Sequence, residues 1–87
     1  MAANAYVLLN IDPAKTGQVV KRLGTIPGAV VREVMGPYDA VVELERDTVV
    51  DLTSAVASKI RSIPGVIATV TCLWIEHPST YHHAGGD

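Results

Sequence analysis

The tripeptide Ile-Pro-Gly occurs twice in this 87-residue chain, at residues 26–28 and at residues 63–65. Each copy follows a segment in which apolar residues recur every three or four positions, as in an amphipathic helix. Each copy also precedes an aliphatic run typical of a strand, residues 29–35 in the first case and residues 66–76 in the second. The repeat therefore predicts two tandem units in which a helix leads through a tight turn into a strand.

The first unit begins with AYVLLNI, residues 5–11, which predicts a strand that is largely apolar on both faces. Asp12 can cap the helix that follows, and Pro13 suits its first turn. We expect this helix to end at residues 23–24. Its apolar face consists of Val19, Val20, Leu23 and Ile26.

The bend GPYD, residues 36–39, connects the two units. It joins the second strand to a third at residues 40–45, and so short a connection predicts an antiparallel hairpin. Asp47 or Thr48 can cap the second helix. The apolar face of that helix consists of Val49, Leu52, Val56, Ile60 and Ile63.

This order of elements, βαββαβ, predicts an α+β ferredoxin-like fold for residues 1–76, with residues 77–87 as a separate tail. Right-handed crossovers would give a four-stranded antiparallel sheet with both helices on one face. The other face carries apolar residues that no remaining element can cover. We therefore expect the chain to dimerise through its sheet.

Composition narrows the class of protein. The hydrophobic fraction is 48%. The net charge is −2 and the seven basic residues are dispersed along the chain, so direct DNA binding is not expected. The N-terminus lacks the basic region of a signal peptide, and no apolar run approaches the roughly 20 residues that span a membrane. A single cysteine, Cys72, excludes an internal disulfide and fits a reducing compartment. These features predict a cytoplasmic protein.

Three motifs, in this order, resemble the effector-binding domain of the Lrp/AsnC regulators, also called the RAM domain (regulation of amino acid metabolism). They are the Gly-x-Tyr-Asp bend at residues 36–39, IPGV at residues 63–66, and Thr-x-Thr at residues 69–71. The resemblance covers residues 5–76 and is closest to the stand-alone form of the domain, which lacks the helix-turn-helix. It implies sheet-mediated dimers that assemble further into rings, with transcription regulation as the context.

The same resemblance implies a non-enzymatic module that binds an amino acid or a similar small effector in a cleft between dimers. The ligand-binding residues carried over from the family are Gly36, Tyr38, Asp39, Thr69 and Thr71. The backbone amides of a glycine bend can bind a carboxylate, and an aspartate can bind an ammonium group. Many family members have a polar residue where this chain has Pro37, so Asp39 and nearby backbone would hold the ligand. No cofactor, metal or catalytic residue is implied.

Plainer interpretations of these residues stay open. The bend suits an ordinary hairpin in which Asp39 accepts backbone N–H groups, and threonine simply favours strands. Cys72 is expected to be a small buried hydrophobe, and Trp74 a core residue or an anchor at the dimer contact. A metal site built from the tail is not expected, because a transition metal needs several converging ligands. The candidate ligands would be Glu76, His77, His82, His83 and Asp87.

Two other functions compete with effector binding. The chain could be a ring-forming scaffold without a ligand, whose tail contacts a protein partner. It could also be an enzyme, since ferredoxin-like dimers occur among small monooxygenases and isomerases. An enzyme would need a polar pocket between sheet and helices, and only Tyr6 and Asn10 offer polar groups there. The two alternatives rank below the binding module.

Overall fold

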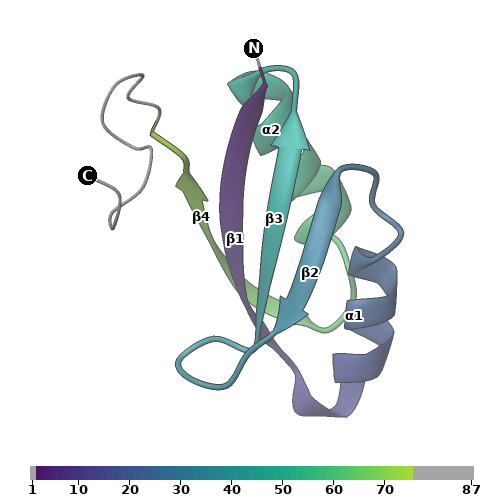
Figure 1. The fold of residues 1–87 in the computed structure, drawn as a ribbon. Coiled ribbons are helices and arrows are strands. Elements are labelled where there is room, and N and C mark those ends of the chain that lie inside the picture. Colours follow the sequence, from purple (N-terminus) through teal and green to yellow (C-terminus); the bar gives the residue numbers. More distant parts are fainter. Residues whose placement is uncertain (1, 76–87) are drawn as a thin grey trace, which may run out of the picture.

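The computed structural model describes residues 2–75, and the predicted tail at residues 77–87 lies outside them. One antiparallel sheet has the strand order β2-β3-β1-β4, and the helices cover one of its faces (Figure 1). The predicted α+β ferredoxin-like fold is therefore confirmed. The elements are β1 (Ala3–Ile11), η1 (Pro13–Lys15), α1 (Thr16–Leu23), β2 (Ala29–Glu33), β3 (Ala40–Arg46), α2 (Val49–Ala55), η2 (Val56–Ile60) and β4 (Val66–Leu73).

Two strands are shorter than the sequence predicts. β2 ends at Glu33 rather than at residue 35, because the next amide, of Val34, already closes the bend by donating to the carbonyl of Asp39. β4 ends at Leu73 rather than at residue 76, although the amide of Trp74 still donates to the carbonyl of Asn4. Hairpin pairing between β2 and β3 is confirmed.

Side-chain caps named by the sequence begin η1, which leads into α1, and α2, whereas α1 itself starts after Lys15 without a side-chain cap. Asp12 accepts from the amide of Ala14 at 3.0 Å, and Thr48 accepts from the amide of Asp51 at 3.0 Å. The second helix is not uniform, because α2 widens into the π-helical η2. Within it Ser58 donates to the carbonyl of Ser54, a back-bond that often bends helices.

The two Ile-Pro-Gly turns make equivalent contacts. The carbonyl of Gly28 accepts from the amide of Glu45, and the carbonyl of Gly65 accepts from the amide of Asp12. The first turn thus binds β3, which precedes α2, and the second turn binds the residue that follows β1 and precedes η1 and α1. Gly65 has a φ of +107°, and a Cβ on it would lie 2.8 Å from Cγ2 of Val19, so glycine is required here.

The core lies between the sheet and the helices and is apolar. Alternate residues of β1 and β3 point into it, as the period of two predicts. None of the buried side chains in residues 2–75 is polar or charged. The largest fully buried side chains are Leu9, Leu23, Leu44, Leu52, Ile60, Val7, Val19 and Val42.

The opposite face of the sheet, here called the open face, is not covered by any element of residues 2–75. Strand register places Tyr6 beside Glu43 and Cys72, and Leu8 beside Val41 and Val70. Tyr6 also contacts Trp74, with ring centroids 5.4 Å apart. The open face comprises Asn4, Tyr6, Leu8, Asn10, Val30, Arg32, Val41, Glu43, Glu45, Ala68, Val70, Cys72 and Trp74.

Cys72 corrects one expectation. The sequence predicts a buried residue, but Cys72 is exposed in the protomer. The alternation that groups it with Val70 and Trp74 was right, yet those residues lie on the open face rather than in the core. Apolar alternation alone does not reveal which face of an edge strand the helices cover.

Candidate functional site

The aspartate of the bend is held by the end of β1. Oδ2 of Asp39 accepts from the amide of Ile11 at 2.8 Å, and the amide of Asp39 donates to the carbonyl of Leu9 at 2.8 Å. The Ile11 amide points toward β3. That strand begins at Ala40, which pairs with Leu9, so no residue of β3 lies opposite Ile11. The Asp39 carboxylate therefore supplies the acceptor that a longer β3 would have provided.

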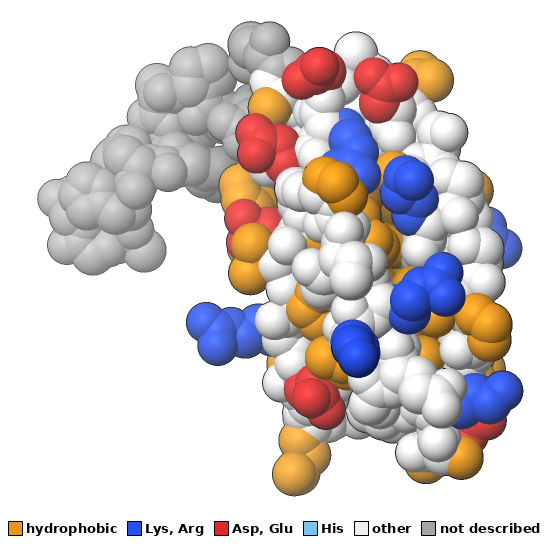
Figure 2. All heavy atoms as spheres, turned by 90° about the vertical axis from the view of Figure 1, so that its right-hand side faces the viewer, with side chains coloured by type: hydrophobic (Ala, Val, Ile, Leu, Met, Phe, Trp, Pro, Cys, Tyr) orange, Lys and Arg blue, Asp and Glu red, His pale blue; other side chains and the backbone are white. Residues whose placement is uncertain are grey.

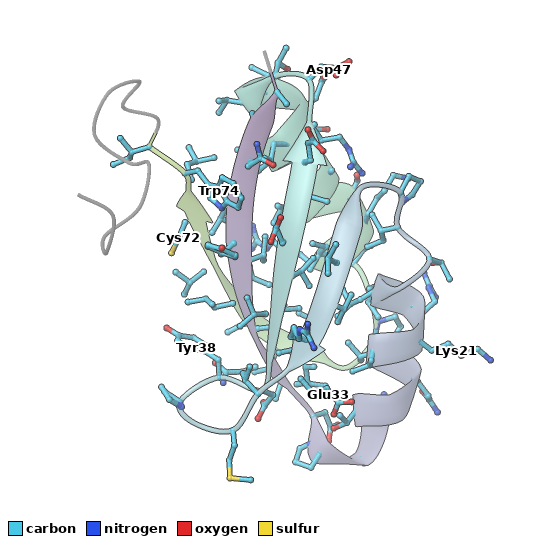
Figure 3. The ribbon with its side chains drawn as sticks, in the orientation of Figure 1. Lys21, Glu33, Tyr38, Asp47, Cys72 and Trp74 are labelled. Atoms are coloured by element: carbon cyan, nitrogen blue, oxygen red, sulfur yellow. The ribbon has the colours of Figure 1, made fainter. Side chains whose placement is uncertain are left out.

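A second hydrogen bond holds the bend against the end of β1. The amide nitrogen of Asn10 donates to the carbonyl of Pro37 at 2.9 Å, so position 37 takes part through its backbone. Tyr38 is half-buried, and its side chain extends to the side of the sheet opposite α1, as do those of Cys72 and Trp74 (Figure 3). Gly36 is exposed, and a Cβ on it would meet no atom within 4 Å.

The two threonines of β4 face the helix layer instead. Thr69 lies opposite Leu9 and Thr71 opposite Val7, both of which are core residues on the helix-covered side. Because β4 is the last strand of the sheet, α2 and η2 leave the threonines partly uncovered. A groove of about 320 Å³ remains there, here called the threonine groove, lined by Thr53, Val56, Ala57, Arg61, Thr69 and Thr71.

Arg61 is a member of the threonine groove that the sequence did not single out. Thr53, Ala57 and Arg61 are spaced by four residues, so one face of the second helix carries all three past β4. That spacing was visible in the sequence. The sequence did not show that this helix face runs along β4, the strand that carries the two threonines.

The five predicted ligand residues form two separate groups in one protomer. The bend is tied to the open-face residue Asn10, whereas Thr69 and Thr71 lie on the helix side of the sheet. β1 also stands between them, since Leu9 pairs with Ala40 on one side and with Thr69 on the other. One ligand would contact both groups only if a second protomer brought its bend to this groove.

A larger hollow, of about 810 Å³, lies elsewhere, between the first Ile-Pro-Gly turn and the second helix. Nη1 of Arg46 donates there to the carbonyls of Pro27 and Glu45, at 2.6 and 2.7 Å. The lining mixes Glu45, Asp47 and Asp51 with Arg46 and Lys59. Lysine and arginine side chains are scattered over the face that carries α1 rather than joined in one patch (Figure 2).

The described residues contain neither a cluster of metal ligands nor a membrane-spanning helix. Within residues 2–75, no three histidine, cysteine, aspartate or glutamate side chains lie close enough to hold a metal ion. The histidines and acids of the tail, from Glu76 to Asp87, lie outside the described residues. No helix in the described part of the chain is long and apolar enough to cross a membrane.

Solved structures provide the clearest comparison. FFRP-DM1 is 31% identical to this chain with a TM-score of 0.80, over 84% of this chain and 99% of that one. A protein from Pyrococcus horikoshii described as hypothetical protein PHS023 is 30% identical with a TM-score of 0.78, over 93% and 99%. E. coli AsnC is 14% identical with a TM-score of 0.79, over 87% of this chain and 52% of AsnC. No family model and no curated protein sequence matches the chain.

The fold and the open sheet face thus define a small α+β domain of the kind found in Lrp/AsnC regulators. At this identity and coverage, the chain belongs to the family of FFRP-DM1, the small FFRP-like proteins. The likeness to AsnC, at low identity, is one of fold.

Proposed function

We propose that the chain is a non-enzymatic, oligomeric binding module that senses an amino acid or a similar carboxylate-bearing metabolite. The threonine groove carries this proposal. The Arg61 guanidinium can bind a carboxylate through two parallel hydrogen bonds. Thr53 already donates its hydroxyl proton to the carbonyl of Val50, which leaves its oxygen as an acceptor for an ammonium group. Val56 and Ala57 supply an apolar wall for a side chain.

The proposed context is transcription regulation. The chain has the fold of E. coli AsnC and of a transcriptional regulatory protein from Pyrococcus furiosus described as a member of the AsnC family. A domain of this kind would respond to the effector concentration by changing its own oligomeric assembly, or by joining full-length regulators in mixed assemblies. The predicted ligand residues of the bend, Gly36, Tyr38 and Asp39, would then reach a threonine groove from a neighbouring protomer.

The same proposal includes a dimer formed through the open face. Tyr6 is 44% exposed, Val30 59% and Val70 42%, which is a large apolar area to leave in water. Two such sheets packed face to face would bury it about 10 Å apart, as in other sheet packings. Leu8 lies near the middle of the open face, so Leu8→Asp should lower the mass of the assembly, measured by light scattering after gel filtration.

Calorimetric titration against each amino acid tests ligand sensing. We expect heat for at least one of them, with the affinity reduced tenfold or more by Arg61→Gln and by Thr71→Val. Arg22→Gln, which removes an exposed arginine outside the threonine groove, is the matched control and should bind as the native chain does. Absence of heat for every amino acid, or equal binding by Arg61→Gln, would overturn the proposal.

A scaffold without a ligand is the second candidate, and the exposed apolar residues of the open face favour it. It predicts stable assemblies that no amino acid changes in mass or thermal stability. The enzyme alternative has less support. It needs a polar group inside the layer between sheet and helices, and the buried side chains of residues 2–75 are all apolar.

A further inference from the structure

We infer that the groove between the two helices is a docking site for a peptide segment of a partner protein, acidic at one end and basic at the other. The hollow of about 810 Å³ described above and a second one of about 210 Å³ share Pro27, Ser58 and Lys59 in their linings. The two hollows thus form one continuous groove, here called the interhelical groove. It runs between the second helix and the segment in which α1 ends and the first Ile-Pro-Gly turn follows. The inference does not depend on the proposed effector ligand.

The interhelical groove carries opposite charges at its two ends. Arg22 and Lys59 lie where α1 and η2 end. Asp47 and Asp51 lie where α2 begins. In Figure 2, acidic side chains stand at the top of the face that carries α1, and lysine and arginine side chains lie below them. A segment with the reverse order of charges would be attracted at both ends, and a segment of uniform charge would be repelled at one of them.

The hydroxyl groups of the interhelical groove favour a peptide over a nucleic acid. Thr25 donates its hydroxyl proton to the carbonyl of Arg22 at 2.7 Å. Ser58 donates to the carbonyl of Ser54 at 2.8 Å, and Ser62 donates to the carbonyl of Ser58 at 2.7 Å. The three hydroxyl oxygens therefore remain as acceptors, which the N–H groups of a peptide can satisfy. Backbone phosphates of a nucleic acid have no such donors, and the acidic end of the groove would repel them.

The spacing of the charges limits the segment that fits. At 1.5 Å of rise per residue, the second helix advances roughly 12 Å from Asp51 to Lys59. An extended peptide advances about 3.3 Å per residue, so its basic and acidic residues should be about four positions apart. The helix wall between the two charges presents the small side chains of Ser54, Ala55 and Ser58, which leave room for a main chain to approach.

The interhelical groove is preformed and accessible. Nη1 of Arg46 ties the wall opposite the second helix to β3, through its hydrogen bonds to the carbonyls of Pro27 and Glu45. A wall held in this way needs little ordering when a peptide binds, which favours affinity. Arg22 and Lys59 are both exposed. The helices cover the side of the sheet opposite the open face (Figure 1), so the proposed dimer would leave the groove free.

Selection from a phage-displayed library of random peptides, about seven residues long, tests the inference on the full chain. We expect the enriched peptides to carry an acidic and a basic residue about four positions apart. A synthetic copy of the most enriched peptide should bind the double variant Arg22→Glu, Lys59→Glu about tenfold more weakly in fluorescence polarisation, because its acidic residue would meet two carboxylates. Lys21→Glu is the matched control and should bind as the native chain does. Lys21 precedes Arg22 on α1, but it lines neither hollow and its side chain extends away from the sheet (Figure 3). Enrichment of peptides without this pair of charges, or equal weakening by Lys21→Glu, would overturn the inference.

Further measurements separate this groove from other sites. Arg61→Gln, which tests the threonine groove, should bind the peptide as the native chain does, so the two proposals can fail independently. Far-ultraviolet circular dichroism should show that the double variant is folded, because both of its positions are exposed. If it does not fold, Arg22→Gln with Lys59→Gln replaces it. A labelled single-stranded DNA oligonucleotide should not bind the native chain, and binding that the double variant abolishes would assign the groove to nucleic acid and overturn the inference.

Discussion

Replacing Asp39 with alanine should lower the free energy of unfolding by about 2 kcal/mol, because hydrogen bonds to charged groups contribute roughly 1.5–3 kcal/mol. Alanine removes the acceptor that lies 2.8 Å from the Ile11 amide. This hydrogen bond is partly buried although Asp39 itself is exposed, so water replaces the carboxylate at that amide only in part. The amide of Asp39, bonded to the Leu9 carbonyl, is unaffected by the change.

Asp39→Asn separates the hydrogen bond from the charge. The amide oxygen of asparagine can still accept from the Ile11 amide, and a neutral hydrogen bond contributes about 1 kcal/mol. Asp39→Asn should therefore lose only about 1 kcal/mol, which is about half the loss expected for Asp39→Ala. Urea unfolding followed by circular dichroism measures both changes. Protomer concentration must be held constant, because association adds to apparent stability.

The result also bears on ligand binding. Asp39 accepts from the Ile11 amide and is also proposed to reach a neighbouring threonine groove, so the ligand affinity of Asp39→Ala must be measured well below its melting temperature. That temperature should fall by roughly 8–16 °C for a 2 kcal/mol loss in a domain of this size. A loss of stability below about 0.5 kcal/mol for Asp39→Ala would refute the structural role of the carboxylate.

Three further substitutions test the fold, each by urea unfolding. Gly65→Ala should cost about 2 kcal/mol or more, because alanine resists positive φ and its Cβ would meet Val19 at 2.8 Å; a neutral result would contradict the role of the repeated turn. Thr48→Ala should cost about 1 kcal/mol through loss of the α2 cap, whereas Thr48→Ser should cost much less. Leu52→Ala, at a fully buried position, should cost about 2–5 kcal/mol, and a loss no larger than that of an exposed alanine substitution would contradict the assigned core.

The elements and their order could be read from the sequence because they depend on local patterns. Period-two alternation in residues 5–11 and 40–45 and helical spacing around Leu52 each involve neighbours a few residues apart. The caps at Asp12 and Thr48 are equally local. The two Ile-Pro-Gly turns then fixed where each helix ended, and the crossover rule left one sheet topology.

The site could not be read in the same way, because its contacts join distant parts of the chain. Asp39 and Ile11 are 28 residues apart, and only the register of β1 with β3 shows that the carboxylate completes a ladder. Likewise, Arg61 joins Thr69 and Thr71 only because η2 passes beside an edge strand. Sequence alone thus determined the fold, whereas packing decided which side of the sheet each polar group occupies.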